Sequence, residues 1–308
     1  MSAEGAFIES LRAFATDPAA RGLNDDAAVL EFGGETLVIT QDVIVEGVHY
    51  LADDPPSDVA WKLVAVNLSD LAGKGARPIG ALLGFTLGEE AWDRAFAEGL
   101  GKALSAFAVP LLGGDTVSAP TRVLSLTAIG RAAGPVPARG GARAGDLLWV
   151  SGAIGDAGAG LRILLGELGP GDPLVERYRN PRPRLEAGAR LAALVSAMMD
   201  VSDGLLLDAA RMATASGCAV LVELDALPLS EAYLALLGEA RIEAASAGDD
   251  YELLFAAAPG AAPAILALAE EIGLPLSRIG RFEAGAGLSL TDAGKPLNLP
   301  PKLGFEHG

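Results

Sequence analysis

The sequence predicts an α/β fold of the α+β type, divided into two domains. Apolar segments typical of strands alternate with segments of helical periodicity along most of the 308 residues, a length that suits two domains. Several strand-like segments end on an aspartate, which suits an active site at one edge of a sheet. Residues 132–145 (AAGPVPARGGARAG) are rich in Gly, Pro and Arg and lack periodicity. We therefore expect a domain junction near residue 138, with domains over residues 1–138 and 139–308.

Composition excludes several classes of protein. Hydrophobic residues make up 51% of the chain, so a large core is available, but no apolar run reaches the length of a membrane span. Residues 1–16 lack the basic start and the cleavage site of a secretion signal. The single cysteine, Cys218, rules out an intramolecular disulfide and a Cys-based metal cluster, and its apolar surroundings indicate a core residue. We expect a cytoplasmic protein without membrane contact.

The net charge of −17 argues against a nucleic-acid partner, because nucleic-acid surfaces need a basic stripe. An anionic ligand is compatible with this charge if bound cations or backbone N–H groups neutralise it. The chain has two histidines, His49 and His307, and no G-x-S-x-G motif. A Ser-His-Asp hydrolase is therefore not expected.

Periodicity and turn residues predict the elements of the first domain. The clearest helix covers residues 59–75, because residues 56–58 (PSD) supply a start signal and Gly73 and Gly75 supply a stop. The acids within residues 21–28 indicate a solvated turn. The other expected helices cover residues 1–16 and 91–106, and the expected strands cover residues 36–42, 79–87, 109–115 and 122–131.

The second domain is expected to alternate strands and helices. Expected strands cover residues 146–152, 198–204, 218–224, 252–258, 276–282 and 287–291, and expected helices cover residues 161–168, 180–197, 205–216, 230–237 and 262–273. Ser202 suits the N-cap of the helix at 205–216, and Asp203 suits its first turn, where the helix dipole favours an acid. In the first domain, the strand at 109–115 is expected to break at its two glycines and to deliver Asp115.

One acid lies on the apolar stripe of the 59–75 helix. Val59, Leu63 and Val66 lie at helical spacing. Asp70 is the next position on this stripe, so its carboxylate faces the interior, where an isolated charge is very costly. Asp70 is therefore either neutralised by a basic or hydrogen-bonding neighbour or holds a metal ion in a cleft. Taken alone, the residue favours the first alternative.

Five further acids occur in similar settings, each after a strand or at the start of a helix: Asp26, Asp42, Asp115, Asp200 and Asp203. A carboxylate-rich site with few histidines suits hard cations, above all Mg²⁺. Phosphoryl transfer mainly requires neutralised charge and in-line positioning, and it needs little covalent chemistry from the protein. The residues alone thus indicate a Mg²⁺-dependent α/β enzyme.

Nine segments, in order along nearly the whole chain, extend this hypothesis: NDDAAV (24–29), TQDVIVEGVHY (40–50), AVNLSDLAGKGARP (65–78), LLGGDT (111–116), VSGAIGDAGAGL (150–161), RPRLEAG (182–188), MDVSDGLLLD (199–208), LPLS (227–230) and AGDDYELLF (247–255). By these segments the chain resembles the thiamine-monophosphate kinase family, which belongs to the superfamily of aminoimidazole ribonucleotide synthetase. VEGVH and GDDYELLF are specific to the kinase, whereas the Asp-bearing segments are shared across the superfamily.

The resemblance implies a reaction and an assembly. The enzyme would transfer the γ-phosphoryl group of ATP to thiamine monophosphate in a direct step, giving thiamine diphosphate. Several Mg²⁺ ions would take part, and the resemblance also allows for a monovalent cation such as K⁺. The family fold has two α/β domains, and the N-terminal sheets of two chains pair across a homodimer. The site would lie between the domains, near that dimer seam.

The resemblance also assigns residues. It places Asp26, Thr40, Gln41, Asp42, Asp70, Asp115, Asp200 and Asp203 around the metals, and it gives Asp70, Asp203 and Arg139 catalytic roles. It places Gly114, Asp115, Arg139 and Ser202 at ATP, and His49, Asp249 and Phe305 at thiamine phosphate. Gln41 stands where Thr or Ser is usual in the family, so its metal contact would come from an amide or backbone oxygen. His49 either hydrogen-bonds the substrate or is a histidine satisfied within its strand.

Two other interpretations compete with the kinase. An aminoimidazole ribonucleotide synthetase would share the Asp-bearing segments, but VEGVH and GDDYELLF argue against it. A non-catalytic nucleotide-binding protein is expected to have lost several of the acids, whereas all six aspartates are present.

Overall fold

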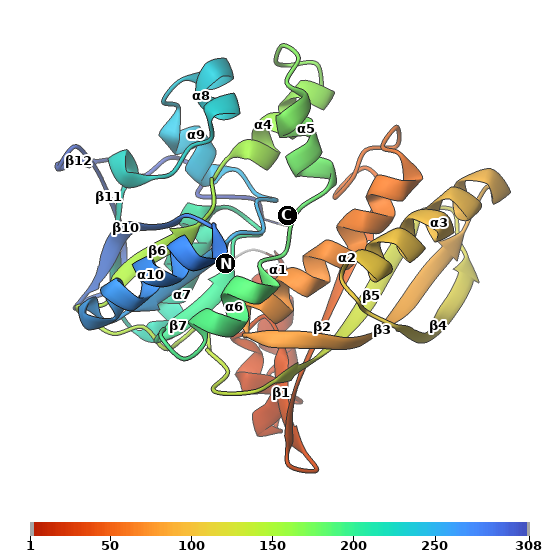
Figure 1. Cartoon of the computed structure of the whole chain (residues 1–308), viewed down its shortest axis with the longest axis horizontal. Helices are drawn as coiled ribbons and strands as arrows, with labels where there is room; N and C mark the ends of the chain where they lie inside the picture. The colour runs from red at the N-terminus through yellow and green to blue at the C-terminus, as the bar shows by residue number, and fades with distance from the viewer. Residues whose placement is uncertain (1–2, 307–308) are drawn as a thin grey trace.

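The computed structural model describes residues 3–306 and is built around two β-sheets (Figure 1). The N-terminal sheet has the strand order β1-β2-β5-β3-β4. Its strands are β1 (Ala28–Phe32), β2 (Glu35–Val45), β3 (Ala76–Leu87), β4 (Leu111–Ser118) and β5 (Val123–Ala132). Its neighbouring strands are antiparallel except for β3 and β4, which are parallel and are joined by the crossover helix α3 (Glu90–Ala106).

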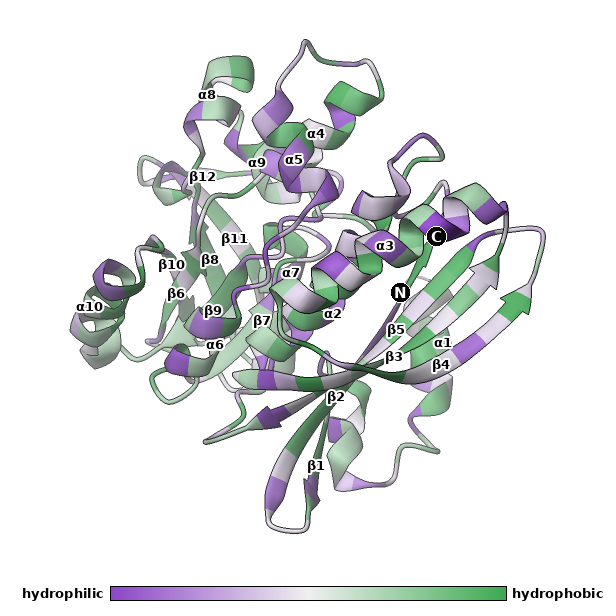
Figure 2. Ribbon diagram, turned by 45° about the vertical axis from the view of Figure 1, so that its right-hand side comes forward, coloured by the Kyte–Doolittle hydropathy of each residue, from purple (hydrophilic) through white to green (hydrophobic). Residues whose placement is uncertain are grey.

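Helices cover one face of this sheet. In Figure 2, α2 (Pro56–Gly73) and α3 lie across that face. Side chains alternate along the strands, and Val38, Leu124 and Leu126 are buried in the same core cluster as the apolar residues of α2. The predicted strands and helices of this region are confirmed, apart from the short strand β1, which was not predicted.

The opposite face of the N-terminal sheet carries exposed apolar side chains. Val43, Leu82 and Val123 lie on it and are 43%, 40% and 39% exposed. At the sheet edge, β4 is exposed along its whole length. The prediction that this strand breaks at Gly113 and Gly114 is wrong, because its pairing with β3 continues through both glycines.

The second sheet has the order β12-β11-β8-β10-β6-β9-β7. Its strands are β6 (Leu147–Ser151), β7 (Ala197–Asp200), β8 (Ala219–Glu223), β9 (Leu253–Ala257), β10 (Leu276–Glu283), β11 (Gly287–Asp292) and β12 (Lys295–Leu297). Together the two sheets and their helices confirm the predicted fold class.

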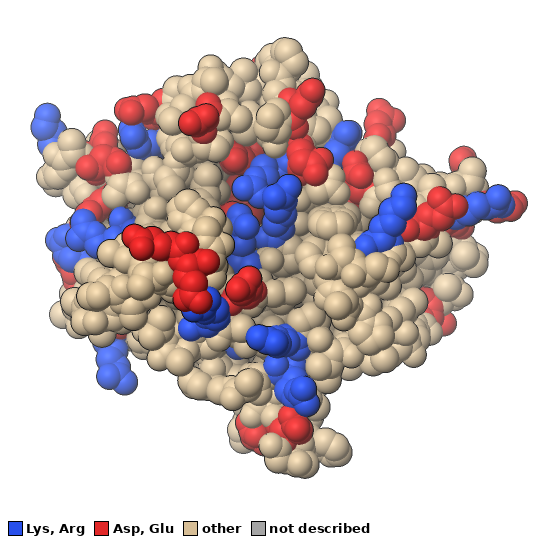
Figure 3. Space-filling model, viewed as in Figure 1, with Lys and Arg blue, Asp and Glu red and all other residues tan. Residues whose placement is uncertain are grey.

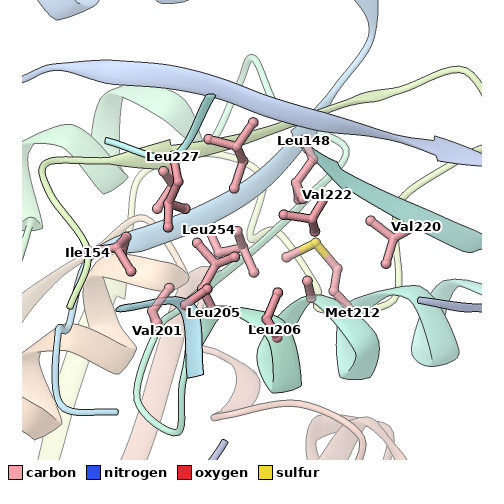
Figure 4. Packing of buried hydrophobic residues seen from close by; sticks show 14 of the residues in the cluster. Leu148, Ile154, Val201, Leu205, Leu206, Met212, Val220, Val222, Leu227 and Leu254 are labelled. Atoms are coloured by element: carbon pink, nitrogen blue, oxygen red, sulfur yellow. The ribbon is translucent and has the colours of Figure 1, made fainter. Parts of the chain in front are cut away.

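Helices pack on both faces of the second sheet, so every residue of its strand β9 is buried. Leu254 belongs to the core cluster beneath α7 (Leu205–Ser216), which Figure 4 shows from close by. Phe255, the next residue, belongs to a separate cluster with α10 (Ala262–Ile272). This two-sided burial makes the sheet a rigid base for the loops that follow β7 and precede β9.

Helix α2 is the central element of the molecule. It is buried on almost every side from Val59 to Gly73, so the predicted single apolar stripe is too narrow. One side packs on the N-terminal sheet, and the other contacts β7 and α6 (Leu185–Leu191). Gly188 of α6 passes so close to the Ala72 carbonyl that a Cβ atom there would overlap its oxygen. This contact fixes the end of α2 that carries Asp70.

Several helices differ from their predicted bounds. In the described residues, α1 (Ala3–Leu11) ends before residue 16, and α4 (Asp156–Leu164) begins five residues earlier than predicted. The short α6 replaces the long helix predicted over residues 180–197. Helices α5 (Asp172–Arg179) and α9 (Arg241–Ser246) were not predicted.

The remaining helices and the surface complete the description. Helix α8 (Glu231–Leu237) has the Ser230 hydroxyl as its N-cap acceptor. Cys218 is buried, as predicted, in the core cluster beneath α7. Of the helices described, none combines the length and the apolar character needed to cross a membrane. On the face shown in Figure 3, basic side chains gather near the middle and acidic ones surround them.

Candidate active site

Predicted acids from separate elements meet where α2 packs against β2 and β7. Asp70 lies in α2, and Asp200 is the last residue of β7. Asp42 lies inside β2, which ends at Val45. The Thr40 hydroxyl donates a hydrogen bond to the Asp70 carboxylate. The backbone N–H of Asp42 donates to the side-chain oxygen of Asn67 at 3.0 Å. We call Asp42, Asp70 and Asp200 the acidic cluster.

Desolvation and mutual repulsion dominate the electrostatics of the acidic cluster. Desolvation, with repulsion from Asp26 and Asp203, raises the pKa of Asp42 to about 6. Desolvation, with repulsion from Asp42 and Asp200, raises the pKa of Asp70 well above its usual range. Burial and then repulsion from Asp26 raise the pKa of Asp200 to about 8. Within residues 3–306, no Lys or Arg forms an ion pair with these three carboxylates.

In contrast to the acidic cluster, Asp26 is paired with basic side chains. Lys74 Nζ lies 2.8 Å from one Asp26 oxygen and also pairs with Asp25, while Arg139 pairs with the other Asp26 oxygen. Arg21 lies 2.6 Å from Asp25. Burial opposes ionisation of Asp26, but Arg139 and Lys74 outweigh it and hold the pKa of Asp26 below its usual range. The prediction of a solvated turn is wrong here, because both carboxylates are buried within ion pairs.

The turn that carries Ser202 and Asp203 is held by a buried acid of α7. Asp208 accepts hydrogen bonds from the backbone N–H groups of Ser202 at 3.2 Å and Asp203 at 3.1 Å. Burial and repulsion from Asp203 raise the pKa of Asp208 to about 7. Arg211 forms ion pairs with both Asp203 and Asp208. The predicted capping roles are wrong, because Gly204 is the N-cap residue and Asp203 precedes the helix.

Lys62 of α2 connects two of the predicted substrate residues. Its Nζ donates at 2.9 Å to the Asp249 carboxylate and at 2.9 Å to the His49 carbonyl. The Tyr251 hydroxyl donates to the same carboxylate at 3.1 Å. The Val45 N–H donates to His49 Nδ1 at 3.1 Å, so the neutral imidazole carries its proton on Nε2. His49 lies in the turn after β2 and not on the strand itself.

Phe305 reaches the site from the C-terminal segment. Its N–H donates to the Asp203 carbonyl at 2.8 Å, and the residue is 46% exposed. Gly304 packs so tightly beside the Asp203 carbonyl that a Cβ atom would overlap it. The structure therefore brings the backbone of Phe305 to the turn that carries Ser202.

Comparison with known proteins identifies the family. The model of the AIR synthase related protein N-terminal domain matches residues 24–132, and the model of the C-terminal domain matches residues 143–293. The thiamine-monophosphate kinase of Caulobacter vibrioides is 44% identical over 306 residues, covering 95% of this chain and 86% of the relative. The chain belongs to the thiamine-monophosphate kinase family.

Solved structures of this family share the fold. The crystal structure of thiamine-monophosphate kinase from Stenotrophomonas maltophilia is 40% identical, with a TM-score of 0.79, over 95% of this chain and 96% of that one. A complex of AaThiL with AMPPCP and TMP is 30% identical, with a TM-score of 0.84, over 98% of this chain and 96% of that one. The resemblance found in the sequence is confirmed.

The structure does not bring every predicted residue of the kinase family site together. Asp42 pairs across the sheet with the core residue Leu126. Asp115 pairs with Gly84, which lies beside Ser125 on the uncovered face. Asp115 is thus on the opposite face from Asp42, and it and the adjoining Gly114 lie about three strand spacings, or roughly 14 Å, away on the edge strand. Within one chain they do not reach the acidic cluster.

Gln41 is also turned away from the cluster. It lies between Thr40 and Asp42 on β2, and its side-chain oxygen accepts a hydrogen bond from Thr127 at 3.0 Å. Successive strand residues point to opposite faces, so the side-chain amide of Gln41 lies on the other face of the sheet from Asp42.

The described residues contain no ready-made metal centre. Across residues 3–306, no three His, Cys, Asp or Glu side chains are arranged to hold an ion. The acidic cluster nevertheless suits a hard cation, because all its donor atoms are carboxylate oxygens and no basic side chain among the described residues balances their negative charge. A divalent ion would relieve the repulsion that raises the pKa values of Asp42, Asp70 and Asp200.

Sequence reasoning missed four charged residues of the site: Lys62, Lys74, Asp208 and Arg211. All four lie in, or directly after, the helices α2 and α7, and they resemble ordinary solvated helix residues in the sequence. Helical spacing could have found one pair, since Arg211 follows Asp208 by three positions and forms an ion pair with it.

Proposed function

We propose that this chain transfers the γ-phosphoryl group of ATP directly to thiamine monophosphate. A phosphate oxygen of thiamine monophosphate forms a bond to the γ-phosphorus, and the bond from that phosphorus to the β,γ-bridging oxygen breaks, so that thiamine diphosphate and ADP are the products. The observation that carries the proposal is an acidic cluster with unbalanced charge, set beside Arg139 and Arg211. The family membership and the AaThiL complex with AMPPCP and TMP support it.

The proposal includes several Mg²⁺ ions. Asp42, Asp70 and Asp200 would be the principal ligands, with Asp26, Asp203 and Thr40 next to them. When bound, Mg²⁺ supplies charge neutralisation between two phosphorylated substrates and polarises their oxygens. A K⁺ requirement stays a prediction from the family resemblance.

The protein's own groups fit the proposed chemistry. The acceptor is a phosphate oxygen that is already ionised at neutral pH, so the reaction needs no strong general base. Arg139 and Arg211 provide fixed positive charge near the predicted ATP-binding residue Ser202, where it offsets charge on the transferred group. His49, with its proton on Nε2, acts as a hydrogen-bond donor to thiamine monophosphate.

The substrate pocket in this proposal lies between the His49 turn and the loop that carries Asp249. Lys62 joins these two segments by hydrogen bonds. The half-exposed ring of Phe305 offers a stacking surface for a thiamine ring. We propose the cytoplasm as the compartment, in line with the single cysteine.

We also propose that two chains form a homodimer through their N-terminal sheets. The uncovered face exposes apolar residues such as Val43, Leu82 and Val123, and an exposed apolar sheet face favours a partner. Asp115 lies on that face, with Gly114 beside it on the edge strand β4, and both would then reach ATP near the seam between the chains. In such a dimer, Asp115 could take its predicted role at ATP and the metals although it lies far from the acidic cluster of its own chain.

A substrate panel tests the proposal. Purified protein is incubated with ATP and Mg²⁺, and ADP formation is followed with thiamine monophosphate, thiamine or an aminoimidazole ribonucleotide precursor as the second substrate. We expect ADP to form with thiamine monophosphate and not with the other two second substrates. Turnover of the ribonucleotide precursor without turnover of thiamine monophosphate would overturn the assignment.

A further inference from the structure

Lys74 is an unusual feature of the site. It follows the last residue of α2 and is wholly buried, with no exposed surface. Its ammonium group has three oxygen acceptors, which are the Asp25 carboxylate, the Asp26 carboxylate at 2.8 Å and the Met198 carbonyl at 3.2 Å. An ammonium group has three N–H donors, so every donor of Lys74 is matched.

The three acceptors come from two distant parts of the chain. Asp25 and Asp26 precede β1, whereas Met198 lies in β7, two residues before Asp200. Lys74 therefore joins the N-terminal acidic turn to the strand that delivers a member of the acidic cluster. A buried site lined by oxygen atoms, such as the one that holds the Lys74 ammonium, is also the kind of site in which a metal cation binds.

The charges of the site divide into two halves. Asp25 and Asp26 are matched by Lys74, Arg139 and Arg21. The acidic cluster, in contrast, has no Lys or Arg partner among the described residues. A metal ion gains most energy where negative charge is unbalanced, and least where a tethered cation already holds the carboxylates.

We propose that the Lys74 ammonium is a built-in cation that occupies the place of one metal ion beside Asp25 and Asp26. Divalent ions then bind at the acidic cluster, and Asp26 contributes to metal binding only weakly. The inference rests on the proposed function for its choice of Mg²⁺, but it concerns metal binding by the chain alone. Its failure can therefore be told apart from failure of the kinase assignment.

Counting bound ions tests the proposal directly. Mn²⁺ is titrated into metal-free protein without nucleotide or thiamine monophosphate, and free Mn²⁺ is measured by electron paramagnetic resonance. Lys74→Met should bind roughly one more ion per chain than the wild type, because a neutral side chain leaves the two carboxylates free. Lys74→Arg keeps the charge and should retain the wild-type count. The matched control is Lys62→Met, which removes a buried lysine that pairs with Asp249 and leaves Asp26 untouched.

An unchanged Mn²⁺ count in Lys74→Met would overturn the proposal, as would an equal increase in Lys62→Met. Thermal unfolding in EDTA and in Mg²⁺ gives a second measurement if Lys74→Met is too unstable to titrate. The unfolding temperature of Lys74→Met should fall in EDTA and recover most of the loss in Mg²⁺, because an added ion replaces the lost ammonium. An equal loss in both buffers would contradict the idea that a metal ion can take its place.

Discussion

The Thr40 hydroxyl donates a hydrogen bond to the Asp70 carboxylate and so links β2 to α2 at the centre of the acidic cluster. This bond favours the ionised form of Asp70, whereas desolvation and repulsion from Asp42 and Asp200 oppose it and prevail. Asp70 is thus held in place by the fold but lacks a balancing charge. That combination is expected of a metal ligand.

Replacing Asp70 by Asn should lower kcat by about a thousandfold or more, because a neutral amide weakens metal binding where charge develops during phosphoryl transfer. The fold should survive, since Asn keeps the shape of the side chain and removes repulsion. kcat and the unfolding temperature are measured together. Asp53→Asn, at an exposed position outside the site, is the control and should change neither. Wild-type kcat in Asp70→Asn would return Asp70 to a structural role.

The stability of the metal-free protein should fall as pH rises from the ordinary carboxyl pKa of 3.8 to about 8. The folded pKa values of Asp42 and Asp200 lie above the ordinary carboxyl value, so the folded state holds more protons than the unfolded state in this range. The stabilising effect of protonation is therefore present at low pH and is lost as pH passes through the folded pKa values. Mg²⁺ should flatten the decline, because it replaces the lost protons as the balancing charge.

Unfolding temperatures at several pH values, in EDTA and in Mg²⁺, check this pH dependence. Asp200→Asn removes one of the titrating groups and should show a shallower slope in EDTA. Parallel slopes with and without Mg²⁺ would mean that the cluster does not bind the ion.

Replacing Lys62 by Met should raise the KM for thiamine monophosphate by about tenfold and leave kcat within about threefold, because Lys62 positions the substrate residues and not the reacting atoms. Stability should fall by about 1–3 kcal/mol, since Asp249 keeps some solvent contact after its partner is lost. Steady-state kinetics and denaturant unfolding give both numbers. Lys102→Met, on the exposed face of α3, should change neither. A drop in kcat alone would contradict the positioning role.

Gly188→Ala should destabilise the protein by about 3 kcal/mol, because its new methyl group overlaps the Ala72 carbonyl where α6 meets α2. Gly101→Ala is the matched control in helix α3, where nothing lies within 4 Å of the new atom. That variant should gain about 0.5–1 kcal/mol from reduced backbone freedom. Chemical denaturation measures both. Equal effects of the two substitutions would mean that α2 and α6 do not pack closely.

Much of the fold could be predicted because long segments carry clear periodicity. The helix at residues 59–75 and the strand at 36–42 were found within a few residues. The short helices α5 and α9 were missed, because six to eight residues span too few turns to show a period. The pairing of β4 through two glycines was missed because glycine normally marks a break, and only the neighbouring strand shows otherwise.

The acids of the site could be predicted, but their partners could not. Asp70 and Asp200 stood out as carboxylates among apolar residues. Lys74 lies at the end of a helix, where a lysine normally interacts with the helix dipole in solvent. Its burial against Asp26 arises from the packing of two separate parts of the chain. The role of Asp115 stays a prediction from the family resemblance, because within one chain it lies on the opposite face of the sheet from Asp42.

Phosphorus NMR of the complete reaction tests the central claim most directly. The protein is mixed with ATP, Mg²⁺ and thiamine monophosphate, and all phosphorus products are followed together. Direct transfer predicts thiamine diphosphate and ADP in equal amounts, no accumulation of inorganic phosphate, and no reaction in EDTA. ADP with inorganic phosphate in place of thiamine diphosphate would contradict direct transfer to thiamine monophosphate.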